Sequence, residues 1–166
     1  MKHFEKVIGY EDIKFELERM IDIMNRPEQY SKLGVEVPKG IMLHGTPGVG
    51  KTLLANELIK ASGRKAFILR KDKPDGELVG IIKKTFEDAI AAAPSIVFLD
   101  DMDKFSSTDE RRSDAEEYVA IQSCMDDVKG KGDFVIATAN NLCKFPKSLL
   151  RRGRLDRIFQ MMPPPG

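Results

Sequence analysis

Apolar residues along the chain follow two patterns, which predict alternating helices and buried strands. From residue 13 onward, apolar positions recur at offsets of about four, seven, eight and eleven, which is one stripe of an amphipathic helix over 11–25. Short apolar runs without polar alternation predict buried strands at 41–43, 66–69, 96–99 and 134–137, with a weaker one at 158–161. Further helices are predicted at 51–61, 78–93 and 113–128.

This alternation predicts an α/β fold. Apolar strands separated by helices are typical of a parallel sheet covered on both faces. We therefore expect a doubly wound, mostly parallel, five-stranded sheet in one domain over residues 1–166. The stretch 29–39 is predicted to be a connection between the first helix and the first strand, and Pro38-Lys39-Gly40 marks its end before the apolar run at 41–43.

Composition narrows the class of protein without naming a function. The 166 residues carry 27 Lys and Arg against 26 Asp and Glu, and 42% are hydrophobic. This balance excludes wholesale disorder and gives no reason to expect a polyanionic partner. There is no apolar run of membrane-spanning length and no signal-peptide pattern, so we expect a cytoplasmic protein, with the cytoplasmic face of a membrane as the alternative for the parent protein. Two cysteines and two histidines, at unrelated spacings, do not complete a metal-ligand set.

A glycine-rich motif lies between the strand at 41–43 and the helix at 51–61. It reads Gly45-Thr46-Pro47-Gly48-Val49-Gly50-Lys51-Thr52 and fits the phosphate-loop pattern G-x-x-x-x-G-K-[ST] in full. Glycines let backbone N–H groups surround phosphates, Lys51 adds a cation, and Thr52 offers a hydroxyl to Mg²⁺. We assign residues 46–52 and Leu53 to nucleotide binding. A dinucleotide site is disfavoured because it uses another glycine spacing.

Two carboxylates follow the strand at 96–99. Asp100 is predicted to support Mg²⁺, and Asp101 to act as a general base on the attacking water. The alternative is a solvated acidic turn, which the nearby phosphate loop makes less favourable. Asp103 is as compatible with a helix cap or an ion pair as with catalysis.

Polar and basic residues follow the strand at 134–137. Asn140 could hold a water beside a γ-phosphate, and the guanidiniums of Arg151 and Arg154 could neutralise transition-state charge. Taken alone, Asn140 would more often cap a strand end. The arginines would more often form a solvated or nucleic-acid-facing patch, but the balanced overall charge disfavours nucleic acid.

Taken together, these motifs resemble the large subdomain of an AAA+ ATPase, most similar to the AAA modules of FtsH-type proteases and related unfoldases. The resemblance covers nearly the whole chain. It implies that Ile8 and Gly9 border an adenine pocket, that Asn140 is the sensor-1 residue, and that Arg151 and Arg154 are arginine fingers. It also implies ATP or ADP and Mg²⁺ as cofactors, a hexameric ring with sites between subunits, and protein substrates.

Three departures from the family pattern qualify what the resemblance implies. Asp101 stands where the family has glutamate, one methylene longer. The pore-loop aromatic is replaced by Pro74-Asp75 before Gly76, which argues against threading by an aromatic side chain. The sequence ends before the helical lid and has no His-Glu-x-x-His protease motif. We therefore expect a weakly active, monomeric fragment of a protein-unfolding ATPase. The alternative is a slow or inactive nucleotide-binding scaffold, and a small-molecule kinase on the same fold is a weaker possibility.

Overall fold

A five-stranded parallel sheet forms the centre of the protein. The computed structural model describes residues 3–71, 77–105, 116–128 and 131–162. Every neighbouring pair of strands is parallel, and the order across the sheet is β2-β3-β4-β1-β5. The predicted α/β fold is confirmed. The strands are β1 (Gly40–His44), β2 (Ala66–Leu69), β3 (Ile96–Leu99), β4 (Phe134–Ala139) and β5 (Arg157–Gln160).

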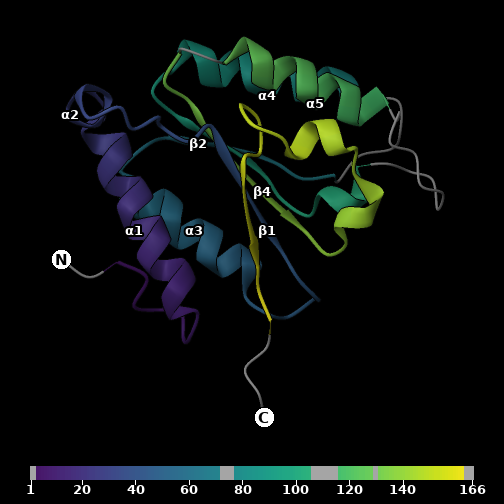
Figure 1. Ribbon diagram of the computed structural model, residues 1–166. Helices are drawn as coiled ribbons and strands as arrows, with labels where there is room; N and C mark the ends of the chain where they lie inside the picture. The colour runs from purple at the N-terminus through teal and green to yellow at the C-terminus, as the bar shows by residue number, and fades with distance from the viewer. Residues whose placement is uncertain (1–2, 72–76, 106–115, 129–130, 163–166) are drawn as a thin grey trace.

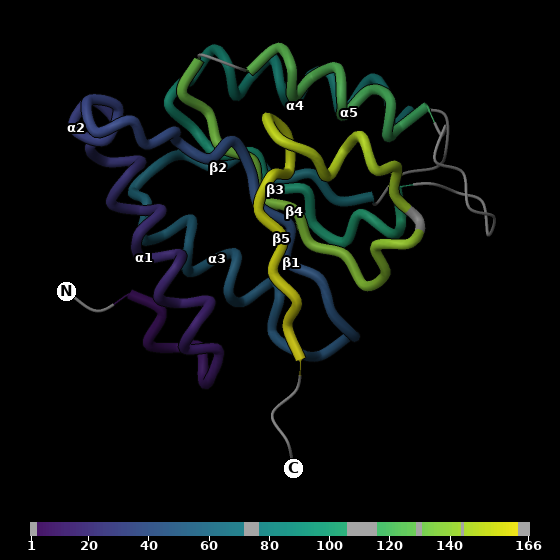
Figure 2. Tube along the Cα trace, viewed as in Figure 1, coloured from purple at the N-terminus to yellow at the C-terminus, as the bar shows by residue number. Residues whose placement is uncertain are grey.

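Helices cover both faces of this sheet. Figure 1 shows α1 and α3 together on one side and α4 and α5 on the other, and the Cα trace shows the same layers (Figure 2). None of the helices within the described residues has the length and apolarity to span a membrane. The helices are α1 (Glu11–Asn25), α2 (Pro27–Lys32), α3 (Lys51–Ser62), α4 (Leu78–Ala91) and α5 (Glu116–Asp127).

One helix was absent from the sequence prediction. The stretch 29–39 was expected to be a connection throughout, but α2 occupies its beginning. Pro27 stands in the first turn of α2, where its fixed φ favours a helix and its missing N–H has no intrahelical partner to lose. Among the described loop residues, three short 3₁₀ turns lie at Met102–Lys104, Leu142–Lys144 and Lys147–Leu150.

Successive strand residues point into two separate cores. On β3, Ile96 and Phe98 pack toward α1 and α3, whereas Val97 and Leu99 pack toward α4 and α5. All four side chains are fully buried. Burial on both faces explains why the strands lack polar alternation, since neither face of a central parallel strand meets water.

The parallel register brings the carboxyl ends of the strands to one edge. His44 pairs with Ala139 and Leu99 pairs with Ala137, while Leu69 on β2 pairs with Leu99. The loops that follow β1, β2, β3 and β4 therefore meet at this edge. Open α/β sheets bind ligands outside the carboxyl ends of their strands, so the candidate site is expected here.

Candidate functional site

The glycine-rich loop connects β1 to α3 through backbone conformations that need glycine. Gly48 and Gly50 have φ angles of 85° and 96°, which L-residues with side chains rarely adopt. At Gly45 the constraint is space, because a Cβ would lie 2.2 Å from the Met161 carbonyl oxygen. Gly50 precedes the first turn of α3 without a side-chain cap. The loop and helix start thus form a concave backbone surface suited to an anion.

Lys51 lies between the loop and the end of β4. Its Nζ donates hydrogen bonds to the carbonyl oxygens of Gly45 at 2.5 Å and Thr46 at 3.0 Å, and to Asn140 Oδ1 at 2.8 Å. Partial burial lowers the pKa of Lys51, and the nearby carboxylates of Asp103, Asp101 and Asp100 oppose that shift. Lys51 thus joins two regions that lie 89 residues apart in the sequence.

The Asp100 carboxylate accepts hydrogen bonds from two hydroxyl groups. Thr52 Oγ1 donates to Asp100 Oδ1 at 3.2 Å, and Thr138 Oγ1 donates to the same oxygen at 3.0 Å. Thr138 also accepts a hydrogen bond from the Asp101 backbone N–H at 2.8 Å. Because Thr138 is almost fully buried on β4, it fixes both acidic residues at the end of β3. The sequence prediction did not include Thr138.

Asp100 also pairs with an arginine from β2's end. Arg70 Nε lies 2.7 Å from Asp100 Oδ2 in a charge-assisted hydrogen bond. The Asp100 N–H donates to the Leu69 carbonyl oxygen, which places the two residues side by side. Arg70 was not among the site residues predicted from the sequence, so this contact is another functional candidate that the sequence prediction missed.

Asp101 and Asp103 have different surroundings. Asp101 adopts a left-handed backbone, with φ of 59°, and its carboxylate pairs with Lys104 at 3.2 Å. Asp103 accepts hydrogen bonds from the backbone N–H groups of Asn140 at 2.5 Å and Asn141 at 3.0 Å. Of the alternatives left open for Asp103, this geometry favours a structural role that holds the end of β4 in place.

A cleft of about 430 Å³ unites most of the predicted site residues. It is formed by the phosphate loop, the start of α3 and the ends of β3 and β4. Its lining residues are Pro47, Gly48, Gly50, Lys51, Thr52, Leu53, Asp100, Asp101, Thr138 and Asn140. The convergence of cationic, hydroxyl, carboxylate and amide groups gives this cleft the chemistry of a nucleotide-phosphate site.

Four predicted cofactor-binding residues lie outside the lining of that cleft: Ile8, Gly9, Thr46 and Val49. Ile8 is 91% exposed, so the expected adenine contact stays a prediction. The N-terminal segment is nevertheless tied to the loop, because the Tyr10 hydroxyl donates to the Val49 carbonyl oxygen at 2.8 Å. The pore-loop residues 74–76 lie outside the described residues.

The two predicted arginine fingers differ in their contacts. Arg154 is largely buried and donates to Asp126, Gln122 and the Ser148 carbonyl oxygen. Arg151 is exposed. Neither residue lines the cleft. Residues that act in a neighbouring subunit would lie outside their own site, so the finger assignment stays a prediction.

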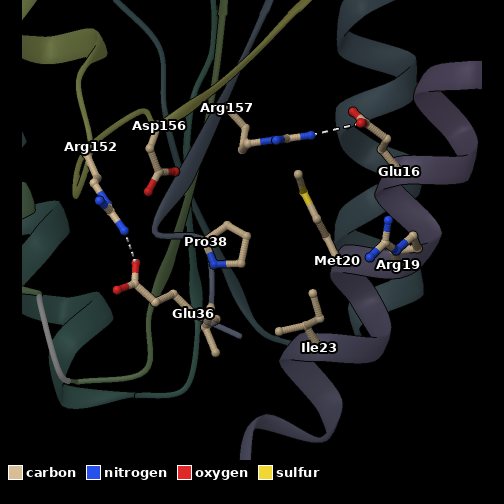
Figure 3. A pocket seen from close by; sticks show the side chains of 10 residues that line it. Glu16, Arg19, Met20, Ile23, Glu36, Pro38, Arg152, Asp156 and Arg157 are labelled. Carbon is tan, nitrogen blue, oxygen red and sulfur yellow. Dashed lines mark hydrogen bonds and ion pairs between the residues drawn. The ribbon is translucent and has the colours of Figure 1, made fainter. Parts of the chain in front are cut away.

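A second hollow, of about 400 Å³, lies at the opposite edge of the sheet, between α1 and the segments that enter β1 and β5 (Figure 3). Two ion pairs span its walls: Arg157 with Glu16 at 2.9 Å and Arg152 with Glu36 at 3.1 Å. These four charges pair with one another, and none belongs to the predicted site.

Comparison with known proteins agrees with this geometry. Residues 41–163 match the model of the family described as "ATPase family associated with various cellular activities (AAA)". The chain is 34% identical to an ATP-dependent zinc metalloprotease FtsH of Malacoplasma penetrans, with 95% of this chain and 21% of the relative covered. It is 36% identical to the YME1 homolog of Caenorhabditis elegans, with 92% and 22% covered.

A third relative has a shorter chain. The proteasome-activating nucleotidase of Methanosphaerula palustris is 32% identical, with 98% of this chain and 42% of the relative covered. The chain thus spans between about a fifth and two fifths of the length of these three relatives.

Proposed function

Because the chain belongs to the AAA family of ATPases, we propose that it binds Mg-ATP in the cleft and supports ATP hydrolysis as the core of a ring-forming assembly. One observation carries the proposal. Lys51, Thr52, Asp100 and Asn140 come from three separate segments and line the same cleft. In-line attack on a γ-phosphate needs a cation, a metal-supporting pair and a water-positioning group in this kind of arrangement.

The loop and Lys51 would bind the phosphates. Backbone N–H groups near Gly48 and Gly50 and the amino end of α3 favour negative charge. Lys51 Nζ already reaches both the loop and Asn140, so a phosphate group bound between them would lie within its range.

Thr52 and Asp100 fit a magnesium ion, which would neutralise phosphate charge during transfer. Their oxygens lie 3.2 Å apart at the edge of the cleft. Nucleotide-bound Mg²⁺ takes only one or two protein ligands, together with phosphate oxygens and water. This pair is therefore a sufficient donor set when a nucleotide is bound.

Asp101 and Asn140 would act on the attacking water. Asp101 lies in the cleft and can accept a proton, while the Asn140 amide can orient the water. Asp103 holds the backbone on which Asn140 is carried. Arg151 and Arg154 would supply positive charge to the site of a neighbouring copy.

The proposed output is protein unfolding or remodelling. Relatives with this module carry the names of ATP-dependent proteases and of a proteasome-activating nucleotidase. A ring of AAA modules could convert hydrolysis into motion of a protein substrate, with any peptidase activity belonging to another segment.

A slow nucleotide-binding scaffold is the second candidate, and the surroundings of Asp101 favour it. The side chain is shorter than glutamate and is paired with Lys104. Reduced reach toward the water could cost on the order of a hundredfold in rate.

Titration of the full 166-residue chain with Mg-ATP, followed by ATP turnover at increasing protein concentration, tests the proposal. We expect one nucleotide per chain and a weak specific activity that rises only at concentrations where the monomeric chain assembles, because sites completed by a neighbour need assembly. Binding with flat, near-zero turnover in assembled rings would favour the scaffold. Failure to bind any nucleotide would refute both functions.

A further inference from the structure

Arg70 forms an ion pair inside the proposed metal site. The two partners have unequal exposure, since the Arg70 side chain is 51% exposed and the Asp100 side chain is 11% exposed. The guanidinium therefore approaches the carboxylate from the solvent side. Strand pairing between Leu69 and Leu99 fixes this arrangement, because it places the residues after each strand next to one another.

The Asp100 oxygens have separate partners. Oδ1 accepts hydrogen bonds from the Thr52 and Thr138 hydroxyls, whereas Oδ2 accepts from Arg70. The hydroxyls are neutral and can remain when a cation approaches the carboxylate. Arg70 is positively charged, so it must share Asp100 with that cation or release it.

We propose that Arg70 competes with Mg²⁺ for Asp100 and thereby raises the magnesium concentration that tight nucleotide binding requires. This inference rests on the proposed function of the same cleft. Two positive groups on one carboxylate repel each other, and removing the guanidinium from Asp100 sacrifices a charge-assisted hydrogen bond. Both costs fall on metal binding and neither falls on the phosphate loop, which connects β1 to α3.

Half-exposure of Arg70 sets the size of the effect. Water and salt screen charges at such a position, so the effect is smaller than for a buried pair. We define the magnesium midpoint as the free Mg²⁺ concentration at which half of the magnesium-dependent gain in ADP affinity is reached. Removal of the guanidinium charge should lower this midpoint about tenfold, which is the size expected of a partly screened charge interaction. The difference should shrink as ionic strength rises.

The experiment measures ADP affinity of the full chain as a function of free Mg²⁺, by isothermal titration. It compares wild type with Arg70→Gln, which removes the charge, and Arg70→Lys, which keeps it. Arg26→Gln is a matched control, because Arg26 also forms an ion pair and is 54% exposed, but lies at the end of α1.

We expect a lower magnesium midpoint for Arg70→Gln, but not for Arg70→Lys or Arg26→Gln. In EDTA, where no free Mg²⁺ is present, the ADP affinity of Arg70→Gln should differ from that of wild type by a smaller factor than the midpoint does. An unchanged midpoint would overturn the inference, as would the same shift in the Arg26→Gln control. A large loss of ADP affinity in EDTA would also overturn it, by making Arg70 a phosphate ligand. If wild type itself bound no nucleotide under any condition, the proposed function would fail, and this inference with it.

Discussion

The phosphate loop and the acidic end of β3 form two walls of the same cleft, yet they are built in different ways. The loop consists of consecutive residues that would contact a ligand mostly through backbone N–H groups. The left-handed backbone of Gly48 and Gly50 determines the shape of the loop. The acidic wall depends on side chains from neighbouring strands, with Thr138 from β4 and Arg70 from the end of β2. The first is a local structure, and the second exists only once the sheet has formed.

This difference determines how each wall should respond to substitution. In the loop, one charged side chain reaches into a preformed backbone cradle, so its loss should affect ligand binding more than folding. In the acidic wall, buried hydroxyl and carboxylate groups satisfy one another, so loss of a partner should affect folding as well. Substitutions in each wall test that contrast.

Lys51→Ala should have the largest effect on nucleotide binding. A hydrogen bond to a charged group contributes about 1.5–3 kcal/mol, so we expect ATP affinity to fall on the order of a hundredfold. The midpoint of urea unfolding should change little, because Lys51 is only partly buried. Lys84→Ala is the control, since Lys84 forms an exposed ion pair on α4. Equal ATP affinity in Lys51→Ala and wild type would remove the phosphate-loop assignment.

Thr138→Val should instead reduce stability. The substitution keeps the shape but removes the hydroxyl, which leaves the Asp101 N–H without its partner and removes one donor from Asp100. Leaving such a group unsatisfied costs about 1–3 kcal/mol, measurable as a lower urea midpoint. Thr138→Ser keeps the hydroxyl and should restore much of the loss. If Thr138→Val unfolded at the wild-type midpoint, the acidic wall would not depend on β4.

The same contrast explains what the sequence could predict. The strands at 66–69 and 96–99 match the predicted ranges. The apolar run at 96–99 is buried on both faces, whereas β2 is an edge strand on which Ile68 is exposed. Lys51, Thr52, Asp100 and Asn140 were found because each stands at a fixed offset from a strand end. Those residues line one cleft.

Contacts across the sheet could not be predicted in that way. The hydrogen bonds made by Arg70 and Thr138 depend on which strands are neighbours, and strand order is not visible in apolar periodicity. Helix α2 was missed for a local reason, because the stretch 29–39 was assigned as a connection from the residues at its end, whereas the signal for a helix start is Pro27, which precedes that stretch. A threonine inside an otherwise apolar strand was the available signal for Thr138, since a buried hydroxyl needs a partner.

Asp101→Glu tests whether the acidic wall is adapted to a short side chain. The added methylene extends the carboxylate toward the cleft, and we expect ATP turnover per assembled ring to rise on the order of tenfold. Stability should fall slightly, because the left-handed conformation at this position suits aspartate better than glutamate. Lower turnover would indicate that the site is built around aspartate.

Tyr10→Phe should have the smallest effect on stability and ATP affinity. It tests whether the phosphate loop keeps its structure without contacts to distant parts of the chain. The Tyr10 hydroxyl bonds to the Val49 carbonyl oxygen across 39 residues, so it anchors a local structure from a distance. Losing a neutral hydrogen bond of this kind costs about 0.5–1.5 kcal/mol. We expect a small decrease in the urea midpoint and a loss of ATP affinity of less than about tenfold. A loss as large as that of Lys51→Ala would mean that the phosphate loop also depends on a long-range side-chain contact, and the two walls would then differ only in degree.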